Sequence, residues 1–278
     1  MIRKKLIKIF AACMMTVSFL GAAAMSVHAE IVKETEPNDT KETAELIQAN
    51  NETAKGTVDR TYSGQYTIKG TTSRTDSDWY KVFLMAGTRY MTCNGDEFNF
   101  VIEDKNGNEL LSRTYMDYAV LTAYSFDVRT AGYYYVKITG IIPTSTNYLF
   151  NIGSPTYSLS NCEIPCKEGV INMTSADEIK AAHFDGEALT EIPKDAIAYS
   201  VTLSGIRSTQ IKYARLKNES RGLDFALNIS TWSKDGLTSM NMPVASMWTA
   251  SLAYSNATSF TPVLKIYYAY PVYSTKVR

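Results

Sequence analysis

The sequence predicts an all-β protein, and three observations lead to that prediction. Tyrosine is abundant, with 19 in 278 residues, and tyrosine and threonine both favour strands. Short runs alternate apolar and polar side chains, most clearly over residues 78–86, as expected for half-buried strands. The dipeptide Asn106-Gly107 within residues 104–108 is a strong hairpin signal, and long helical periodicity is scarce.

The first half of the mature chain is predicted to consist mainly of short strands. These strands are expected at 62–69, 78–86, 90–93, 98–103, 110–115, 120–128, 133–139 and 148–152. Many short strands at this spacing predict a β-sandwich or barrel, and the lack of intervening helices argues against a parallel α/β fold. One short helix is expected before the strands, at 40–49, with Thr40 as its N-cap.

The second half begins with a polar connector after Gly153 and then returns to β character. Ser175 and Glu178 have the spacing of a capping box, which predicts a short helix that ends before Gly186. Strands are expected at 198–203, 210–216, 224–232, 246–254 and 262–270. We therefore divide the chain into residues 1–29, a first β-sandwich at 30–154 and a second, mostly β sandwich-like domain at 155–278.

Residues 1–29 have the three parts of a cleavable secretory signal peptide. Basic residues come first, an apolar run follows at 9–24, and Val27 and Ala29 occupy the −3 and −1 positions of a cut after Ala29. A retained membrane anchor is the alternative interpretation. No later stretch is long and apolar enough to cross a bilayer, so we expect a secreted or cell-surface protein with no stable membrane span after cleavage.

Cleavage changes the charge balance. It removes four basic residues from 28, which leaves 24 Lys and Arg against 28 Asp and Glu, a net charge of −4. Nucleic-acid-binding proteins usually carry a basic excess, so this balance argues against a nucleic-acid partner.

Three cysteines remain after cleavage, namely Cys93, Cys162 and Cys166. An odd number leaves at least one thiol unpaired within the chain. Cys93 lies in a predicted strand and is expected to be a buried apolar residue. For Cys162 and Cys166 three alternatives stay open, which are a local disulfide, two free thiols or metal ligands, and the disulfide is slightly favoured.

Three motifs in the first half resemble those of a known family. They are Glu-Thr-Glu-Pro-Asn-Asp-Thr at 34–40, Asp-Ser-Asp-Trp-Tyr at 76–80 and Ala-Gly-Tyr-Tyr-Tyr-Val at 131–136. Together and in this order they resemble the bacterial pre-peptidase C-terminal domain, whose relatives include the collagen-binding domains of clostridial collagenases. The resemblance covers about residues 32–153 and implies a jelly-roll-like β-sandwich in an exported protein. It implies a binding or accessory role and no catalysis.

The resemblance also implies a calcium site. By motif, the linker ligands would be Glu34, Glu36, Asn38 and Asp39, and the ligands at the start of a strand would be Asp76 and Asp78. The chemistry is consistent, because Ca²⁺ takes six to eight oxygen ligands from carboxylates and carbonyls. Two facing acidic clusters would repel each other without a cation. The alternative is that these acids are solvated and that Asp78 caps a turn.

A second calcium loop at Asp104, Asn106 and Asn108 is rejected in favour of a hairpin turn. These residues match positions 1, 3 and 5 of an EF-hand, but position 12 is Tyr115 instead of Glu.

The sequence carries no recognisable catalytic motif. His183 is the only histidine of the mature chain, and neither G-x-S-x-G nor H-E-x-x-H occurs. Glycoside hydrolysis by two carboxylates needs no local motif and stays open. We therefore expect a non-catalytic protein, with a secreted hydrolase or inhibitor, its site in the second domain, as the alternative. A structural role in the cell envelope is a third possibility.

Aromatic residues on strands suggest a binding face. Tyr133, Tyr134 and Tyr135 are consecutive, so Tyr134 should point to the opposite side from its two neighbours. Tyr267, Tyr268 and Tyr270 show the same pattern. Exposed tyrosines on a sheet suit an extracellular protein or polysaccharide as partner, whereas ordinary cross-strand pairing is the alternative.

Overall fold

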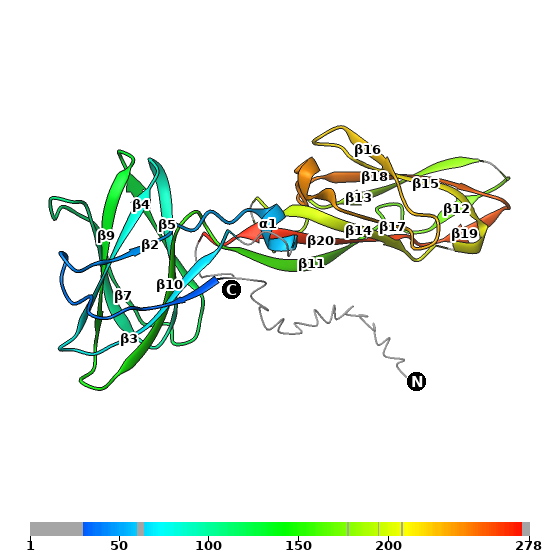
Figure 1. The fold of residues 1–278 in the computed structure, drawn as a ribbon. Helices are drawn as coiled ribbons and strands as arrows, with labels where there is room; N and C mark the ends of the chain where they lie inside the picture. Colours follow the sequence, from blue (N-terminus) through cyan, green and yellow to red (C-terminus); the bar gives the residue numbers. More distant parts are fainter. Residues whose placement is uncertain (1–29, 60–63, 177, 194, 207, 274–278) are drawn as a thin grey trace, which may run out of the picture.

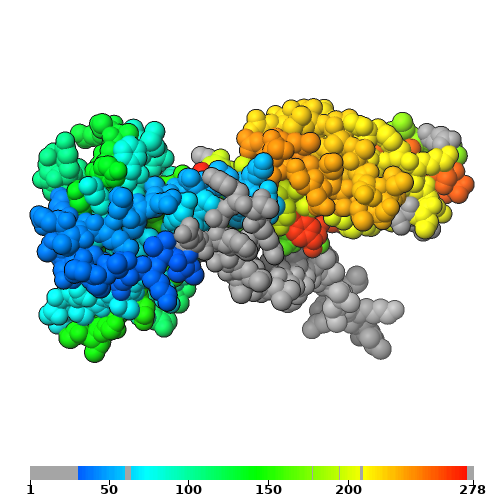
Figure 2. Space-filling model, viewed as in Figure 1, coloured from blue at the N-terminus to red at the C-terminus, as the bar shows by residue number. Residues whose placement is uncertain are grey.

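The computed structural model describes residues 30–59, 64–176, 178–193, 195–206 and 208–273, so the predicted signal peptide lies outside the described residues. Strands dominate, and the predicted all-β class is confirmed. Figure 1 shows two β-sandwiches: the strands of the second run roughly along the line that joins the two, and those of the first run roughly across it. Figure 2 shows them as two lobes that meet near the residues of the short helix α1 (Ala54–Val58).

The first sandwich consists of two five-stranded sheets. One sheet has the order β1 (Glu30–Lys33), β3 (Tyr66–Thr72), β10 (Thr146–Gly153), β5 (Gly87–Gly95) and β8 (Thr122–Val128). The other has the order β2 (Glu45–Ile47), β4 (Ser77–Leu84), β9 (Gly132–Gly140), β6 (Phe98–Glu103) and β7 (Glu109–Tyr115). Only β1 and β2 pair in parallel with their neighbours, β3 and β4.

Strand alternation places one apolar layer between these two sheets. On β4, Tyr80, Val82 and Leu84 are buried, whereas the residues between them face outward. The centre is aromatic: the rings of Tyr80 and Phe150 lie 5.2 Å apart in an edge-to-face arrangement. As predicted, Tyr134 is buried, and its neighbour Tyr133 is 48 % exposed.

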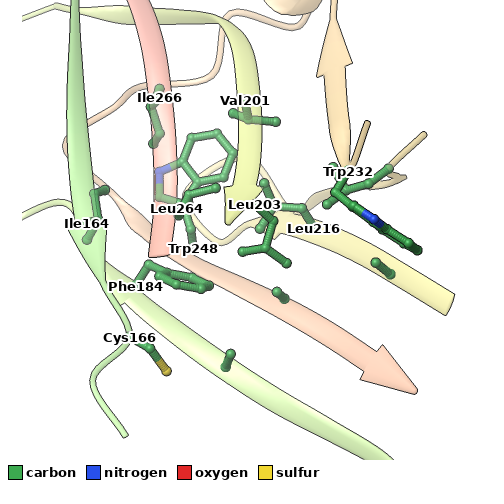
Figure 3. Packing of buried hydrophobic residues seen from close by; sticks show 14 of the residues in the cluster. Ile164, Cys166, Phe184, Val201, Leu203, Leu216, Trp232, Trp248, Leu264 and Ile266 are labelled. Carbon is green, nitrogen blue, oxygen red and sulfur yellow. The ribbon is translucent and has the colours of Figure 1, made fainter. Parts of the chain in front are cut away.

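The second sandwich packs two four-stranded sheets around a core of its own. The first sheet has the order β11 (Tyr157–Pro165), β20 (Val263–Pro271), β14 (Ile197–Ser204) and β17 (Ser233–Asp235). The second has the order β13 (Ile179–Asp185), β18 (Met247–Tyr254), β15 (Ile211–Asn218) and β16 (Leu223–Ala226). A small ribbon of β12 (Ile171–Met173) and β19 (Thr258–Phe260) and two 3₁₀ turns, η1 (Ser208–Gln210) and η2 (Leu237–Met240), complete it. Figure 3 shows fully buried Trp248 among Phe184, Leu264 and Ile266 in this core.

Both helices predicted from capping patterns are wrong. Thr40 hydrogen-bonds the backbone and side chain of Thr43 in a turn, and the chain then extends into β2. Glu178 accepts hydrogen bonds from the Thr174 backbone and hydroxyl, and β13 follows in place of a helix. Ala182 and Phe184 on β13 face the core, so pairing with β18 outweighs a local cap signal.

The polar connector is also structured, because β11 runs through it for nine residues. Its partner is β20, and the pair extends from Tyr157 opposite Pro271 to Pro165 opposite Val263. Cys162 and Cys166 are both free, so the slightly favoured disulfide is wrong. Four residues of extended chain span about 13 Å, whereas a disulfide needs Cα atoms within about 7 Å. The predicted strand at 224–232 is shorter than expected, since β16 ends at Ala226.

The two sandwiches meet at a segment that precedes most of the first one in sequence. Helix α1 is capped by Thr53, whose side chain accepts from the Gly56 N–H at 3.0 Å. It contacts β11, β20 and η2 of the second sandwich (Figure 1). Beside it, Glu52 is 6 % exposed and accepts hydrogen bonds from the Thr57 hydroxyl at 2.7 Å and the Tyr157 N–H at 3.3 Å.

The carboxyl group of Glu52 therefore connects α1 with the first residue of β11. Burial raises the pKa of Glu52 from 4.5 to about 7, against the effect of its two hydrogen bonds. The folded protein thus favours the uncharged carboxyl, and this contribution to stability is complete below pH 4.5 and is lost as the pH rises through 7.

We expect Glu52→Gln to remove part of this pH dependence. Between pH 5 and pH 8 the melting temperature of the wild type should fall relative to that of the variant, with a difference in unfolding free energy of at most about 3 kcal/mol. Thermal melts across this pH range measure it. Glu109→Gln, at an exposed position of β7, is the matched control and should follow the wild type. Parallel curves for wild type and Glu52→Gln would show that Glu52 does not titrate in this range.

Candidate metal centre and binding face

The linker that follows β1 is hydrogen-bonded to two strands, β3 and β4. The Glu34 N–H donates to the Lys69 carbonyl on β3 at 3.0 Å, and the Trp79 N–H on β4 donates to the Asn38 carbonyl at 2.8 Å. Residues 34–38 are thus held at both ends by backbone hydrogen bonds. This places the acidic linker beside the acidic start of β4.

Three of the six predicted metal ligands meet there. Glu34, Glu36 and Asp78 each offer one carboxylate oxygen, and these oxygens lie within 4.8 Å of one another. Glu36 also accepts from the Asn38 N–H at 3.0 Å, which bends the linker around the cluster. The sequence predicted these residues by motif, and the fold brings them together from two distant segments.

Two side chains at this cluster are fully buried and lack partners. Asp78 and Asn38 are both 0 % exposed. Among the described residues, neither carboxylate oxygen of Asp78 and neither amide atom of Asn38 has a hydrogen-bond partner. A buried polar group without a partner costs about 1–3 kcal/mol, and a charged one costs more. Such groups are rare in native proteins and suggest a ligand that satisfies them.

Electrostatics at the cluster are unfavourable to a charged Asp78. Burial raises the pKa of Asp78 to about 7, and the neighbouring carboxylates of Asp76, Glu34 and Glu36 act in the same direction. The nearby Tyr148 hydroxyl opposes this shift, but it makes its hydrogen bond to Glu34, at 2.8 Å, instead of to Asp78. The protein therefore concentrates negative charge here, and no ion pair between described residues involves Glu34, Glu36 or Asp78.

Asp39 and Asp76, the other two predicted ligands, lie next to each other outside the group of three carboxylates. Burial and then the charge of Asp39 raise the pKa of Asp76. The two residues lie at the edge of the cluster and add negative charge near it. All six predicted ligands thus lie in one region, and the backbone of Asn38 bonds both to the Glu36 carboxylate and to Trp79, the residue after Asp78.

Tyrosines and a glycine that sequence reasoning missed form the wall of this site. Tyr148 donates to Glu34 and lies 2.5 Å, oxygen to oxygen, from the hydroxyl of Tyr80. The Thr71 N–H and hydroxyl hold the other Glu34 oxygen at 2.8 and 3.0 Å. A Cβ at Gly70 would lie 2.2 Å from both Glu34 Oε2 and the Tyr148 hydroxyl, so any larger residue would displace these two side chains. A glycine inside a strand is a known sign of close approach.

The donor atoms fit a hard cation. Carboxylate and amide oxygens surround the site, and neither histidine nor cysteine takes part. Oxygen ligands of this type suit Ca²⁺, whereas zinc and copper sites usually include nitrogen or sulfur.

The rejected EF-hand-like segment is a turn, as predicted. The Asp104 carboxylate accepts the N–H groups of Asn106 and Asn108 at 2.8 and 2.9 Å and also the Asn108 side-chain amide at 2.8 Å. These bonds close the connection between β6 and β7. The carboxylate is used by the turn itself.

A second cluster, around His183, does not form a nucleophile and base. Glu168 lies between the other two groups: it accepts from the Cys166 thiol at 2.9 Å and contacts His183 Nδ1 at 2.5 Å. Burial raises the pKa of Cys166 to about 11, so its sulfur stays protonated. Although burial opposes it, hydrogen bonds from Cys166 and His183 hold the pKa of Glu168 at about 2. The histidine therefore interacts with the carboxylate of Glu168 and is not placed to take a proton from the Cys166 thiol.

The outer face of β4 and β9 carries a ladder of aromatic rings and lysines. Opposite pairs are Trp79 with Lys137, Lys81 with Tyr135, and Phe83 with Tyr133. The ammonium of Lys137 lies 5.5 Å from the Trp79 ring, and that of Lys81 lies 4.7 Å from the Tyr133 ring. We call these six residues the aromatic–lysine ladder. In Figure 1, β9 lies on the side of the first sandwich that faces away from the second.

Comparisons with known proteins bear on the fold alone. No family model and no curated protein matches this chain. A crystal structure of a "putative secreted protein" from Eubacterium rectale is similar over 86 % of this chain and 85 % of its own, with a TM-score of 0.51 and 10 % identity. The pre-peptidase C-terminal domain of a Bacillus anthracis collagenase aligns with 43 % of this chain and 99 % of its own, at 15 % identity and a TM-score of 0.30.

The likeness to the Eubacterium rectale structure therefore extends over most of both chains and concerns the fold. In the part of the chain that the structure describes, no helix combines the length and hydropathy needed to cross a bilayer.

We expect Asp78→Asn to raise the melting temperature of the metal-free protein. The amide keeps the shape of the side chain but removes a buried charge that Glu34 and Glu36 repel, which should stabilise the protein by about 1–3 kcal/mol. A thermal melt in chelator at pH 8 measures this. Asp127→Asn, at an exposed carboxylate that accepts from Thr88, is the matched control. A lower melting temperature for Asp78→Asn would mean that the carboxylate has partners that stabilise it.

Proposed function

We propose that this protein is an exported, non-catalytic accessory module that binds calcium and attaches to an extracellular polymer. The observation that carries the calcium part is the pair of buried, unpartnered side chains, Asp78 and Asn38, beside two further carboxylates. The aromatic–lysine ladder supports the binding part. The export part rests on the N-terminal sequence, and the description of the Eubacterium rectale protein as secreted agrees with it.

In this proposal Asp78, Glu34, Glu36 and the Asn38 amide oxygen hold the ion. When bound, Ca²⁺ supplies positive charge and accepts oxygen ligands that the protein leaves unused. Asp39 and Asp76 lower the local potential further and favour cation entry. The protein supplies the ligands from two segments. The linker supplies two carboxylates and an amide, and β4 supplies the buried carboxylate.

Calcium would act on the structure and not on a substrate. The ion would join the linker at residues 34–38 to β4, and β1, which pairs with β3 through only four residues, would be secured with it. This role agrees with the resemblance of the motifs to the pre-peptidase C-terminal domain. It also agrees with the arrangement at His183, where a carboxylate separates the thiol from the imidazole.

We expect calcium to raise the melting temperature of the mature protein, residues 30–278. Binding to the native state stabilises it by about 2.7 kcal/mol when free calcium is 100 times its Kd. Melts with calcium, with magnesium and with chelator measure the effect, and Asp78→Asn should lose it. An identical melting temperature in calcium and chelator would falsify the calcium part of the proposal.

We expect the mature protein to be retained by an extracellular polymer. Co-sedimentation with insoluble collagen, cellulose, chitin and bacterial cell wall, together with affinity electrophoresis in gels that contain soluble polysaccharides, covers the main classes. Tyr133→Ala should weaken retention, because its ring is exposed in the ladder. Tyr213→Ala, at an exposed tyrosine on β15 of the second sandwich, is the matched control. Free passage through every polymer would contradict the binding part.

A further inference from the structure

Among the residues that the structure describes, no acidic side chain forms an ion pair with Lys81 or Lys137, the two lysines of the aromatic–lysine ladder. Lys41, which reaches the same face and lies 4.6 Å from the Tyr135 ring, is instead neutralised by Glu103 at 2.5 Å. The ladder thus keeps two free cations on a mature chain whose net charge is −4. Local charge of the opposite sign to the whole molecule favours an anionic partner.

Rings and cations alternate along this face. Directly across the two strands, Trp79 faces Lys137 and Lys81 faces Tyr135, so the order of ring and cation reverses from one pair to the next. Diagonal neighbours on paired strands lie about 7–8 Å apart. A partner that lies along the strands therefore meets a ring and a positive charge at the first two pairs, and two rings at the third pair, Phe83 with Tyr133.

The apolar end of the ladder opens into a groove. The groove is open, and it is lined by Phe83 and Tyr133, whose ring centroids lie 5.4 Å apart, and by Leu46 to Ala49, the segment around β2. The groove has a volume of about 430 Å³. Phe83, Tyr133 and Leu46 are 47 %, 48 % and 66 % exposed, so apolar surface continues from the ladder into the groove. An exposed apolar strip of this kind on a soluble protein marks an interaction site.

Building on the proposed function, we infer that the aromatic–lysine ladder binds an extended polysaccharide of uronic acids. Each sugar of such a polymer carries both an apolar ring face and a carboxylate, which matches the alternation of aromatic ring and lysine. A neutral glycan would leave Lys81 and Lys137 unused. A polyol phosphate would offer charge without a ring to stack on Trp79 and Tyr133. An acidic peptide offers flexible side chains in place of rigid rings.

Polygalacturonate is a suitable probe for this inference. Affinity electrophoresis and calorimetry with the mature protein should show binding that weakens as salt is raised, because exposed charges are screened. Soluble neutral dextran, polyglutamate and polyphosphate are the comparison ligands. All titrations use the calcium-loaded protein at one fixed calcium concentration. Because calcium gels long polygalacturonate chains, fragments too short to gel are titrated as well.

The double variant K81Q/K137Q tests the two cations. Both side chains are at the surface, and we expect it to fold normally while its Kd for polygalacturonate rises by at least about tenfold. Lys265→Gln is the matched control, since Lys265 lies 5.3 Å from the Tyr267 ring on the second sandwich and pairs with Glu163. Trp79→Leu, which keeps an apolar side chain but removes the stacking ring, is a second variant and should also weaken binding.

The outcomes separate this inference from the proposed function. Unchanged affinity in K81Q/K137Q, or dextran binding as tight as that of polygalacturonate, overturns the uronate assignment but leaves polymer binding in place. Tighter binding of polyglutamate or polyphosphate also overturns it and assigns the face to that chemistry. Retention by collagen or cell wall without any affinity for polygalacturonate also overturns the uronate assignment and leaves polymer binding in place. Absence of binding to every polymer overturns both.

Discussion

A single buried carboxylate organises one end of the first sandwich. Asp78 points inward at the start of β4, fully buried and without a hydrogen-bond partner among the described residues. Three other features lie around this carboxylate. They are the linker that carries Glu34 and Glu36, the backbone hydrogen bond from Trp79 to Asn38, and the tyrosine hydroxyls beside Glu34. A folded chain that assembles like charges at a buried point needs an opposite charge there, and the oxygen donors indicate its type.

Strand β4 shows how one short segment serves three purposes. Asp78, near the start of the strand, belongs to the candidate cation site. The inward residues Tyr80, Val82 and Leu84 form part of the core, and the outward residues contribute to the ladder. The two-residue period of a strand makes this separation possible, because successive side chains point to opposite faces. A shift of one residue in its pairing with β9 would exchange core and surface, so the register fixes all three roles together.

Sequence patterns predicted most of the strands of the first sandwich because alternation is a local signal. Residues 98–103 agree with β6 at both ends, and the motifs select Glu34, Glu36 and Asp78, the three carboxylates that the fold brings together. Patterns failed where long-range pairing decides the outcome, as in β11, whose sequence is largely polar, and in β13, which a capping pattern precedes. The roles of Glu52, Gly70 and Lys137 depend on neighbours far away in the chain, and no local pattern reveals such neighbours.

Helix α1 changes how the two halves relate to each other. It lies between β2 and β3 in sequence, yet it rests on β20 and η2, and Glu52 bonds to Tyr157 across the junction. A fragment that ends at residue 154 would keep this helix but expose the side that the second sandwich covers. A fragment that begins at 155 would lose a contact it cannot replace. The halves therefore share a contact besides the chain that joins them, and a movement of one half relative to the other would have to displace the five residues of this helix from β20 and η2.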